Sequence, residues 1–460
     1  MKVLMFGWEF PPHISGGLGT ACFGLTSSMN RLGQEITFVL PRVIGNDDEQ
    51  PVDLVNASGV DMGFYPISAE PTEEIVNIDN IKLAAKKSIV SNELLELIAI
   101  DSKLTPYETG EQYKVRVKKQ LRRHLRKNKK NNRGKVVIPD DIMDSYIEGG
   151  CLPLSGGYGK NLLDEVYRYS LIAYKIAERS PFDIIHAHDW MTYPAGIEAK
   201  RASGKPLVIH VHATEFDRTG HHVDQNLYNI ERRGMDAADK IIAVSNRTKQ
   251  IVTQHYGINP TKVSVVHNAV IQDDDRKTDY KRSLKEKVVL FLGRVTSQKG
   301  PSYFIEAARL VLDKIDNIRF VMAGNGDLLA DMIKTTAAMG MQSHFHFTGF
   351  LKGDQLSHIF SITDLCVMPS VSEPFGIVPI EAMRHGLPVI VSKQSGVAEI
   401  LPNAIKIDFW DTQMLADQII DILSDEQGYR KMINQNFEDL KSIHWDNSAQ
   451  KVIDIYKETL

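Results

Sequence analysis

Short apolar runs rich in β-branched residues alternate with amphipathic helical segments along most of the chain, and this alternation restricts the fold more than any other feature of the sequence. Strands that are buried on both faces and joined by helices form mostly parallel sheets with helices packed on each side. In the first half of the chain we expect such strands, with helices such as Ala21–Leu32, Asn161–Arg179 and Thr248–His255 between them. The expected strands are Val3–Phe6, Thr37–Leu40, Ile184–Ala187, Leu207–Val211, Lys240–Val244 and Val263–Val266.

The alternation stops at the polar stretch Gln272–Lys277, which has no face that could join a core, and it then begins again. We therefore predict two doubly wound, Rossmann-like α/β domains, at residues 1–272 and 288–444, joined by a linker at 273–287. Ligands of such sheets bind at the carboxyl ends of the strands, so the cleft between the two domains is the expected site. The strands expected in the second half are Val288–Leu292, Ile318–Ala323, His344–Thr348, Leu365–Pro369 and Pro388–Val391.

The composition excludes several classes of protein. A chain of 460 residues with 43% hydrophobic content is long enough for two cores, and its net charge of −4 gives no overall attraction to nucleic acid or to an anionic membrane. Cys22, Cys151 and Cys366 are far apart and odd in number, which argues against disulfides and against a clustered zinc site. The first apolar run is too short for a signal peptide, and no run approaches the length of a membrane span. We therefore expect a cytoplasmic protein.

The segment from about Val43 to Cys151 does not follow the alternation and is expected to be an insertion in the first domain. Between Lys114 and Lys135 it holds twelve Lys or Arg residues and no Asp or Glu. One interpretation is a solvated excursion or a charged helical hairpin, and the other is a tether for an acidic partner. Aromatic residues are not interleaved with these charges, so specific binding of single-stranded nucleic acid is not expected.

Two carboxylates, Glu373 and Glu381, stand on either side of a glycine-containing turn. Pro379 suits the first turn of a helix, so Ser372–Gly376 is expected to be a loop that leads into a helix ending near His385, with Glu381 about two turns beyond Glu373. Free N–H groups at the start of that helix would face an anion such as a phosphate, while the carboxylates would bind hydroxyl groups of a sugar and a ribose. The alternative is a pair of solvated surface residues.

Two cations and several glycines follow other expected strands. Arg294 and Lys299 stand on either side of a turn after the first strand of the second domain, which suits the binding of a diphosphate. Ser15–Gly19 is a strand-to-helix loop in which the backbone of Gly16 and Gly17 could approach a phosphate, although it lacks the GxGxxG pattern of dinucleotide-binding proteins. Further residues at strand ends are Gly324, Gly349, Phe350 and Leu351.

Histidines gather where two strands of the first domain end, at His186 and His188 on one strand and at His212 on the other. Both ends face the same crevice if the sheet is parallel. Because side chains alternate along a strand, His186 and His188 would point to one face while Asp189 points to the other. We favour the polar rim of a binding site, and a metal site formed by His186, His188 and His212 is the alternative.

Taken in order, these motifs resemble those of one enzyme family. The chain contains Phe10-Pro-Pro with Gly16-Gly17, then His-Ala-His-Asp-Trp, Gly-Arg-Val-Thr-Ser-Gln-Lys-Gly and Glu-Pro-Phe-Gly-Ile-Val-Pro-Ile-Glu. Together they look like the retaining glycosyltransferases of the GT-B fold, the large group 1 family that includes glycogen synthases. The resemblance covers nearly the whole chain except Val43–Cys151, and it is much more specific for the family than for the substrate.

The resemblance implies a role for each of these residues. Arg294 and Lys299 would hold the diphosphate of a nucleotide sugar, Glu373 would bind hydroxyls of the donor sugar, and Glu381 would bind the ribose. His212 would lie beside the transferred sugar. The remaining site residues would be Asp189, near the sugar or acceptor, and the donor-binding Gly16, Gly17, Gly324, Gly349, Phe350, Leu351, Phe375, Gly376 and Ile377.

The family also implies how the reaction would proceed. The departing diphosphate would help to deprotonate the acceptor hydroxyl in a front-face attack that retains configuration, and Arg294 and Lys299 would take the place of a divalent cation. We therefore expect no metal and no cofactor besides the nucleotide sugar itself. In this family the C-terminal helix, here 445–460, crosses back onto the first domain. The alternative is a helix that docks only on the second domain.

The motifs favour ADP-glucose or UDP-glucose as donor and an α-glucan such as glycogen as acceptor. Ile14 stands where bacterial glycogen and starch synthases usually have a Lys, and Glu381 is a second carboxylate that they tend to lack, so the broader family 4 branch is favoured. The alternatives are a transferase for an envelope polysaccharide, glycolipid or small glycoside, with peripheral membrane contact through the basic insertion, and a non-catalytic nucleotide- or carbohydrate-binding regulator. The nucleobase, donor sugar, acceptor and oligomeric state stay open.

Overall fold

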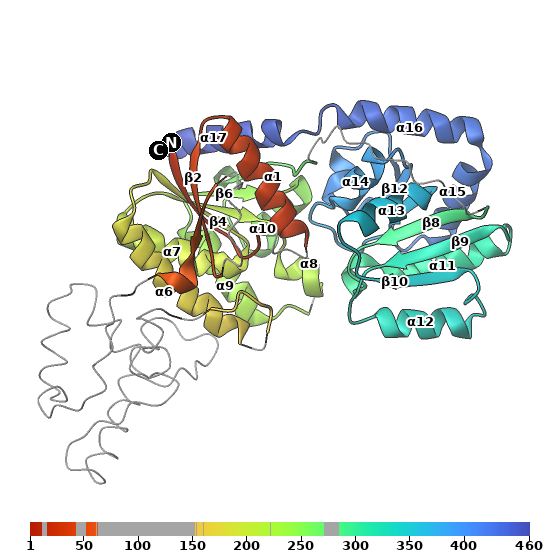
Figure 1. Cartoon of the computed structure of the whole chain (residues 1–460), viewed down its shortest axis with the longest axis horizontal. Helices are drawn as coiled ribbons and strands as arrows, with labels where there is room; N and C mark the ends of the chain where they lie inside the picture. Colours follow the sequence, from red (N-terminus) through yellow and green to blue (C-terminus); the bar gives the residue numbers. More distant parts are fainter. Residues whose placement is uncertain are drawn as a thin grey trace, which may run out of the picture.

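The computed structural model describes residues 1–11, 16–42, 52–60, 62, 152, 154–159, 161–220, 222–270 and 285–460. Two parallel sheets, each packed among helices, confirm the predicted α/β architecture of two Rossmann-like domains (Figure 1). The basic stretch 114–135 and the linker residues 273–284 lie outside the described residues.

The first domain is built on a seven-stranded sheet in the order β3-β2-β1-β4-β5-β6-β7, and all of its strands are parallel. Every residue of its central strands β4 and β5 is buried, as expected of a parallel sheet covered on both faces. The strands are β1 (Lys2–Phe6), β2 (Glu35–Leu40), β3 (Asp53–Asn56), β4 (Ile184–His188), β5 (Leu207–Val211), β6 (Lys240–Ala243) and β7 (Val263–Val265).

Strand β3 was not predicted, because it lies within the segment that we expected to be an insertion. It pairs with β2 in parallel, with Leu54 opposite Phe38 and Val55 opposite Val39. As an edge strand it is only partly buried and carries no continuous apolar run, which weakens its signal in the sequence. Residues 53–56, which lie within the predicted insertion, therefore belong to the sheet of the first domain.

The second domain is built on a six-stranded parallel sheet in the order β10-β9-β8-β11-β12-β13. Five of its strands were predicted, and the sixth, β13, has only three residues and so gave no clear pattern. The strands are β8 (Lys287–Leu292), β9 (Ile318–Ala323), β10 (Phe345–Gly349), β11 (Leu365–Met368), β12 (Val389–Ser392) and β13 (Ile405–Ile407).

The helices pack apolar residues against the sheets and expose polar residues outward. The main helices of the first domain are α1 (Gly17–Arg31), α6 (Leu162–Arg179), α7 (Tyr193–Ser203), α8 (Glu215–Thr219), α9 (Gln225–Ala237) and α10 (Asn246–His255). Those of the second half are α11 (Pro301–Leu312), α12 (Leu329–Ala338), α13 (Asp354–Ile362), α14 (Val378–Arg384), α15 (Thr412–Ser424), α16 (Glu426–Leu440) and α17 (Trp445–Thr459).

The last helix, α17, packs against α1 of the first domain, so the chain ends beside its own beginning (Figure 1). The Trp445 ring covers Gly24, where a Cβ would lie 2.2 Å from the indole nitrogen. Arg31 Nη2 and Asp446 Oδ1 form an ion pair at 2.7 Å. One apolar cluster therefore runs from the first sheet through α17 into the second domain.

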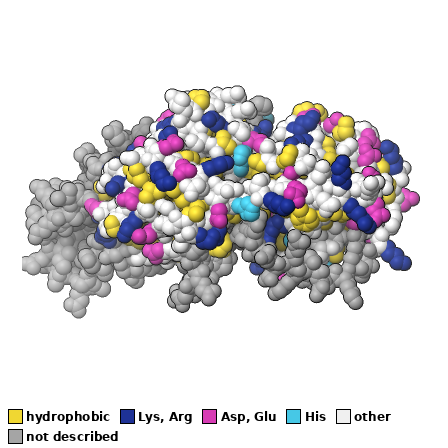
Figure 2. All heavy atoms as spheres, turned by 90° about the horizontal axis from the view of Figure 1, so that it is seen from above, with side chains coloured by type: hydrophobic (Ala, Val, Ile, Leu, Met, Phe, Trp, Pro, Cys, Tyr) yellow, Lys and Arg dark blue, Asp and Glu magenta, His cyan; other side chains and the backbone are white. Residues whose placement is uncertain are grey.

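The surface agrees with the nearly balanced composition. Figure 2 shows Lys and Arg side chains interspersed with Asp and Glu over the face seen from above. Within the described parts of the chain, none of the helices combines the length and the apolarity that crossing a membrane requires.

Candidate active site

The predicted site residues follow the carboxyl ends of parallel strands in both domains. Asp189 comes directly after β4 and His212 directly after β5, while Arg294 follows β8. The two domains meet at these ends, because α8 contacts the short 3-10 helix η4 (Ser297–Lys299). The structure thus gathers both sets of residues along the boundary between the domains.

An ion pair joins Lys299 Nζ to Glu373 Oε2. The Glu373 side chain is 8% exposed and that of Lys299 20% exposed. Ser370 Oγ donates to the same carboxylate at 3.5 Å. The backbone of Glu373 is held as well, because its N–H donates to Gln394 O at 3.0 Å and its carbonyl accepts from Gly396 N–H at 2.9 Å. Contacts within the protein therefore hold the cation and the carboxylate beside each other.

The backbone after Glu373 turns at Gly376, whose φ of +98° favours glycine. Among the described residues, no acceptor contacts the N–H groups of Gly376 and Ile377. Both residues are partly exposed, so their N–H groups can donate to a polar ligand that reaches the fixed carboxylate. This segment fits the predicted binding of sugar hydroxyls.

Glu381 lies in the first turn of α14 rather than deeper in the helix. The helix carries Pro379 at its start and ends near His385, as predicted, but it has only seven residues because the turn at Gly376 extends to Ile377. Burial raises the pKa of the Glu381 carboxyl, and the charge of Arg384 opposes that rise. No donor among the described residues contacts the carboxylate, which leaves it open to a ligand hydroxyl.

Asp189 is buried and has a φ of +66°, the one positive φ among the described residues other than glycine. Such a conformation costs on the order of 1–3 kcal/mol and is kept only where surrounding contacts enforce it. Here Asp189 Oδ1 accepts from Trp190 N–H at 2.8 Å and from Arg218 Nη2 at 3.3 Å. Burial raises the pKa of Asp189, and the charges of Arg218 and Arg294 oppose that rise.

Arg294 is exposed and has neither a hydrogen bond nor an ion pair with any described residue. Its effect on the pKa of Asp189 places its charge near the first domain. The loop that presents it packs directly on the next strand-end loop, because a Cβ on Gly324 would lie only 1.8 Å from Gly293 O. The lack of a side chain at Gly324 therefore allows its backbone to touch the backbone of Gly293, the residue directly before Arg294.

Arg218 was not among the predicted site residues. From α8 it donates to Glu231 Oε1 at 2.9 Å and lies 3.6 Å from Glu215 Oε2, in addition to its contact with Asp189. The two glutamate side chains are each 1% exposed. The guanidinium thus joins three carboxylates and fixes Asp189. The sequence does contain a feature that could have identified Arg218. It is a cation six residues after His212, in a segment rich in acidic residues that follows an expected strand.

Four histidines lie side by side on β4, β5 and the residue that follows β5. His188 is opposite His210 in the parallel register, and neighbouring ring centroids are 4.2 to 5.4 Å apart. Burial lowers the pKa of His186 to about 3, with a smaller contribution from His212, and burial lowers the pKa of His212 to about 3 as well. Both imidazoles are therefore neutral at pH 7. His188 Nδ1 and His212 Nε2 are 3.1 Å apart.

The predicted metal-binding alternative, His186 with His188 and His212, is not the set that the structure brings together. Ring nitrogens of His186, His188 and His210 lie within 4.8 Å of one another, and a second such group consists of Cys22, His188 and His212. His210 was not considered because it is in the interior of β5, one residue before its end. Only the register of the two strands places it beside His188.

The two domains are held together by polar contacts around Glu399, which lies in the second domain. Its carboxylate accepts from the N–H groups of Asn246 and Arg247 and contacts His267 Nε2, each at 2.9 Å. Burial alone would raise the pKa of Glu399, but the hydrogen bonds from His267, Asn246 and Arg247 outweigh it and lower the pKa to about 2. An ionised carboxylate thus bridges the domains.

Two further contacts cross the boundary closer to the predicted donor residues. Ser372 Oγ donates to Asp217 Oδ1 at 2.7 Å. α1 begins at Gly17, and a Cβ on Gly17 would lie 3.9 Å from Ile377 Cδ1. Gly16 caps the same helix. The glycine pair of the first domain therefore lies against the loop that contains Glu373.

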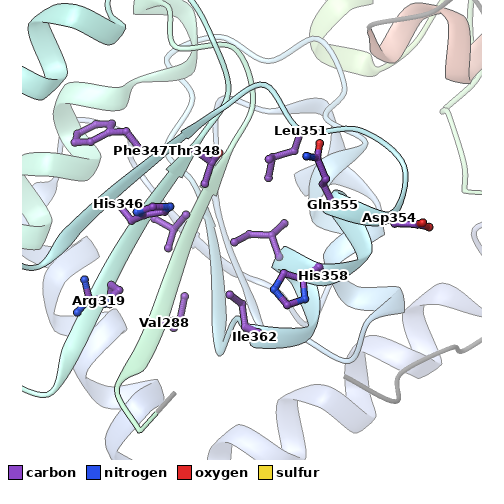
Figure 3. Close-up of a pocket in the computed structure, with 12 residues that line it drawn as sticks. Val288, Arg319, His346, Phe347, Thr348, Leu351, Asp354, Gln355, His358 and Ile362 are labelled. Atoms are coloured by element: carbon purple, nitrogen blue, oxygen red, sulfur yellow. The ribbon is translucent and has the colours of Figure 1, made fainter. Parts of the chain in front are cut away.

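Two further predicted donor-binding residues, Phe350 and Leu351, directly follow β10. Phe350 is 49% exposed, and Leu351 lines a cavity of about 890 Å³ between the sheet and α13 (Figure 3). The cavity lining does not include Arg294, Lys299 or Glu373, so it is separate from the ion pair. Its other labelled walls include Arg319 and His346 from the strands and His358 from α13 (Figure 3).

Three family models match successive parts of the chain. They are described as starch synthase catalytic domain (residues 2–113), glycosyltransferase family 4 (121–274) and glycosyl transferases group 1 (272–439). An uncharacterized glycosyltransferase of Methanocaldococcus jannaschii is 32% identical over 300 residues, which are 60% of this chain and 75% of that protein. The chain belongs to the group 1 glycosyltransferases. The resemblance drawn from the motifs is thereby confirmed.

Other relatives of this glycosyltransferase carry varied names. A UDP-Gal:α-D-GlcNAc-diphosphoundecaprenol α-1,3-galactosyltransferase of Escherichia coli is 30% identical over 242 residues, covering 49% of this chain and 62% of that protein. A D-inositol 3-phosphate glycosyltransferase of Corynebacterium glutamicum is 23% identical over 63% of this chain and 75% of that protein. The enzyme class is common to these relatives, whereas the acceptors in their names differ.

Solved structures confirm the GT-B fold of this glycosyltransferase. Sucrose-phosphate synthase of Thermosynechococcus elongatus superposes with a TM-score of 0.66 at 15% identity, covering 99% of this chain and 98% of that one. Anabaena HepE in complex with UDP and glucose superposes with a TM-score of 0.62 at 16% identity, covering both chains completely. At such identities the agreement concerns the fold alone.

Proposed function

We propose that this glycosyltransferase is a retaining enzyme that transfers a glucosyl unit from ADP-glucose or UDP-glucose to an α-glucan such as glycogen. The observation that carries the proposal is the pairing of Lys299 with Glu373, together with a second cation five residues earlier in the chain, Arg294, that has no partner among the described residues. A diphosphate needs positive charge that the protein has not already neutralised, and Arg294 supplies it. The match of residues 2–113 to the starch synthase model supports a glucan acceptor.

In this proposal the donor lies across the residues at the domain boundary. Arg294 binds the diphosphate, and Lys299 bridges the phosphate and the Glu373 carboxylate. Glu373 accepts from hydroxyls of the glucosyl unit, whose other oxygens accept from the free N–H groups of Gly376 and Ile377. Glu381 accepts from a ribose hydroxyl. In this arrangement each carboxylate of the protein faces a hydroxyl donor of the ligand, and each N–H group faces an acceptor oxygen.

The chemical step then depends on positioning and on charge. As the bond from sugar to phosphate breaks, negative charge grows on the leaving diphosphate, and Arg294 and Lys299 stabilise it. The acceptor hydroxyl attacks from the same face and gives its proton to a departing phosphate oxygen. His212 is neutral, so it can hydrogen-bond the sugar without placing a positive charge beside it. Asp189, held by Arg218, places a carboxylate where the sugar or acceptor is expected.

A nucleotide-release assay tests the proposal. Purified protein is given ADP-, UDP- or GDP-sugars with and without glycogen, in excess chelator added with the substrates, and free nucleoside diphosphate is measured. We expect turnover of a glucosyl donor that glycogen stimulates and that the chelator does not abolish. Turnover that glycogen does not stimulate would refute the glucan acceptor, and a strict magnesium requirement would refute the role given to the two cations.

A lipid-linked acceptor is the second candidate, and the Escherichia coli relative favours it because its name specifies a diphosphoundecaprenol acceptor. The same assay with a polyprenyl-diphosphate sugar in detergent micelles or vesicles separates the two, since only one acceptor should stimulate release. The third possibility, a regulator that binds nucleotide without turnover, predicts binding with no release in either arm. The complete set of charged donor residues argues against it.

A further inference from the structure

Three histidines in the core of the first domain have ring nitrogens without a hydrogen-bond partner. His186 and His188 lie in β4 and His210 in β5, and their side chains are 0%, 0% and 2% exposed. Among the described atoms, His186 Nε2, His188 Nε2 and both nitrogens of His210 have no partner. Buried polar atoms are rarely left unpaired, and each such atom costs about 1–3 kcal/mol. We therefore expect these nitrogens, which lie together in one small space, to bind a group that pairs with them.

We propose that His186, His188 and His210 bind one divalent transition-metal ion, of which Zn²⁺ is the first candidate. One ring nitrogen from each lies within 4.8 Å of one from each of the others. The three rings are stacked, with planes 8° to 29° apart. Zn²⁺ binds imidazole nitrogen at about 2.0–2.1 Å along its lone pair, so the rings would rotate about their side-chain bonds to let the three nitrogens share an ion. Three neutral imidazoles without a carboxylate suit zinc, copper or nickel rather than magnesium or calcium. A water molecule would complete the tetrahedron.

The surrounding hydrogen bonds fit such a site. A metal-binding histidine normally uses its second nitrogen to hydrogen-bond a neighbour, which fixes the tautomer and the direction of the ring. His186 Nδ1 contacts the Tyr456 hydroxyl of α17, and His188 Nδ1 contacts His212 Nε2 at 3.1 Å. In both cases the partner is on Nδ1 while Nε2 is the nitrogen left free. Hydrogen-bond partners that would orient two of the three rings are thus already in place.

The proposed site is distinct from the donor-binding residues, and it explains two further features. With the ion on Nε2, His188 Nδ1 must carry a proton and donate to His212 Nε2, so the metal would set the tautomer of the histidine that faces the sugar. Through Tyr456 the ion would also fasten α17 to the first sheet. Its role is therefore positional and does not replace the cations proposed for the diphosphate.

The alternative group, Cys22 with His188 and His212, fits less well. Its His212 Nε2 is already engaged by His188 Nδ1, and His212 is the more exposed of the histidines. His188 has only one free nitrogen and can serve one ion. We therefore expect Cys22→Ser to keep the metal.

The test is metal analysis of the full chain without a histidine tag, reconstituted with Zn²⁺ or Co²⁺ and passed through a chelating resin. We expect about one equivalent of metal per chain, as for a site with three protein ligands, and visible absorption of tetrahedral Co²⁺. The measurement needs no substrate, so it stands apart from the transfer reaction. A wild-type chain that retains neither ion would overturn the proposal.

Variants identify the ligands. His210→Asn should lose the bound metal, whereas His346→Asn, an exposed histidine on β10, should retain it. Tyr456→Phe keeps the packing but removes the hydroxyl that contacts His186 Nδ1, and it should weaken metal affinity by about 10- to 100-fold. Circular dichroism checks that each variant is folded. Retention of metal by folded His210→Asn, loss of it in Cys22→Ser, or unchanged affinity in Tyr456→Phe would each contradict the assignment.

Discussion

The ion pair between Lys299 and Glu373 predicts that the two cations of the site differ in what they do for stability. Lys299→Ala leaves the nearly buried Glu373 carboxylate without its partner, whereas Arg294→Ala removes an exposed side chain that pairs with no described residue. Both variants should lose activity, because both cations are proposed to stabilise the leaving diphosphate. Only Lys299→Ala should also destabilise the second domain.

The structure sets the size of the difference. Removing one partner of a buried ion pair costs about 3–5 kcal/mol, and we expect about 3 kcal/mol because the lysine side chain is 20% exposed. For a domain of this size each kcal/mol lowers the midpoint of thermal unfolding by about 2–4 °C, so Lys299→Ala should lower it by about 6–12 °C. Arg294→Ala should change stability by less than about 0.5 kcal/mol. Each should reduce kcat by about 10²- to 10³-fold.

Thermal unfolding and nucleotide release, measured on the same preparations, test this. Lys431→Ala, which removes an exposed lysine in α16, is the matched control and should be neutral in both. The double variant Lys299→Ala with Glu373→Gln should recover most of the lost stability, because no charge is left buried, but should stay inactive. The reasoning fails if Arg294→Ala lowers the unfolding midpoint as much as Lys299→Ala, or if the double variant is no more stable than Lys299→Ala.

Three further predictions concern single carboxylates. Glu381→Gln should raise the KM for the donor about tenfold with little change in kcat, as expected for the loss of a hydrogen bond to a charged group. Steady-state kinetics over a range of donor concentrations measures both constants, and a fall in kcat instead of a rise in KM would contradict this prediction. Asp189→Asn should keep the fold but lower kcat at saturating donor, and wild-type turnover would exclude a role for the charge. The lowered pKa of Glu399 means that its contribution to domain closure is complete above about pH 4.5 and is lost as the pH falls towards 2. Small-angle scattering between pH 7 and 2 should show opening in the wild type, whereas Glu399→Gln should be equally open at both pH values.

The strands, and the position of the candidate site residues just after strand ends, could be predicted because both depend on local sequence. Central strands of a parallel sheet are buried on both faces, so β4 and β5 appear as short apolar runs that end at polar residues. The edge strand β3 and the three-residue β13 lack such runs and were missed. Likewise the helix that contains Glu381 was recognised from Pro379, but its first residue depends on the positive φ of Gly376, which residue types alone did not locate.

Contacts between distant residues could not be predicted in this way. Lys299 and Glu373 are 74 positions apart, and both were identified as donor residues without any sign that they would pair with each other. Arg218 was missed because its partners lie in different segments, Asp189 directly after β4 and Glu231 in α9, and no local pattern joins them. Polar clusters of this kind arise from the packing of strand ends, after the fold has been set.

The histidines of the first domain show how a local sequence pattern and the pairing of strands together build a cluster of polar side chains. Alternation along a strand places His186 and His188 on one face of β4, and the sequence alone permits that step. Parallel pairing then places His188 opposite His210, so the histidines of the two strands form one row of neighbouring rings. Because His188 contacts both this row and His212, any ion or proton taken up in the core would change the hydrogen bond that His212 can offer to a sugar. The packed core and the proposed donor site are therefore joined through one imidazole, and a change at His210 is expected to alter turnover without touching the donor.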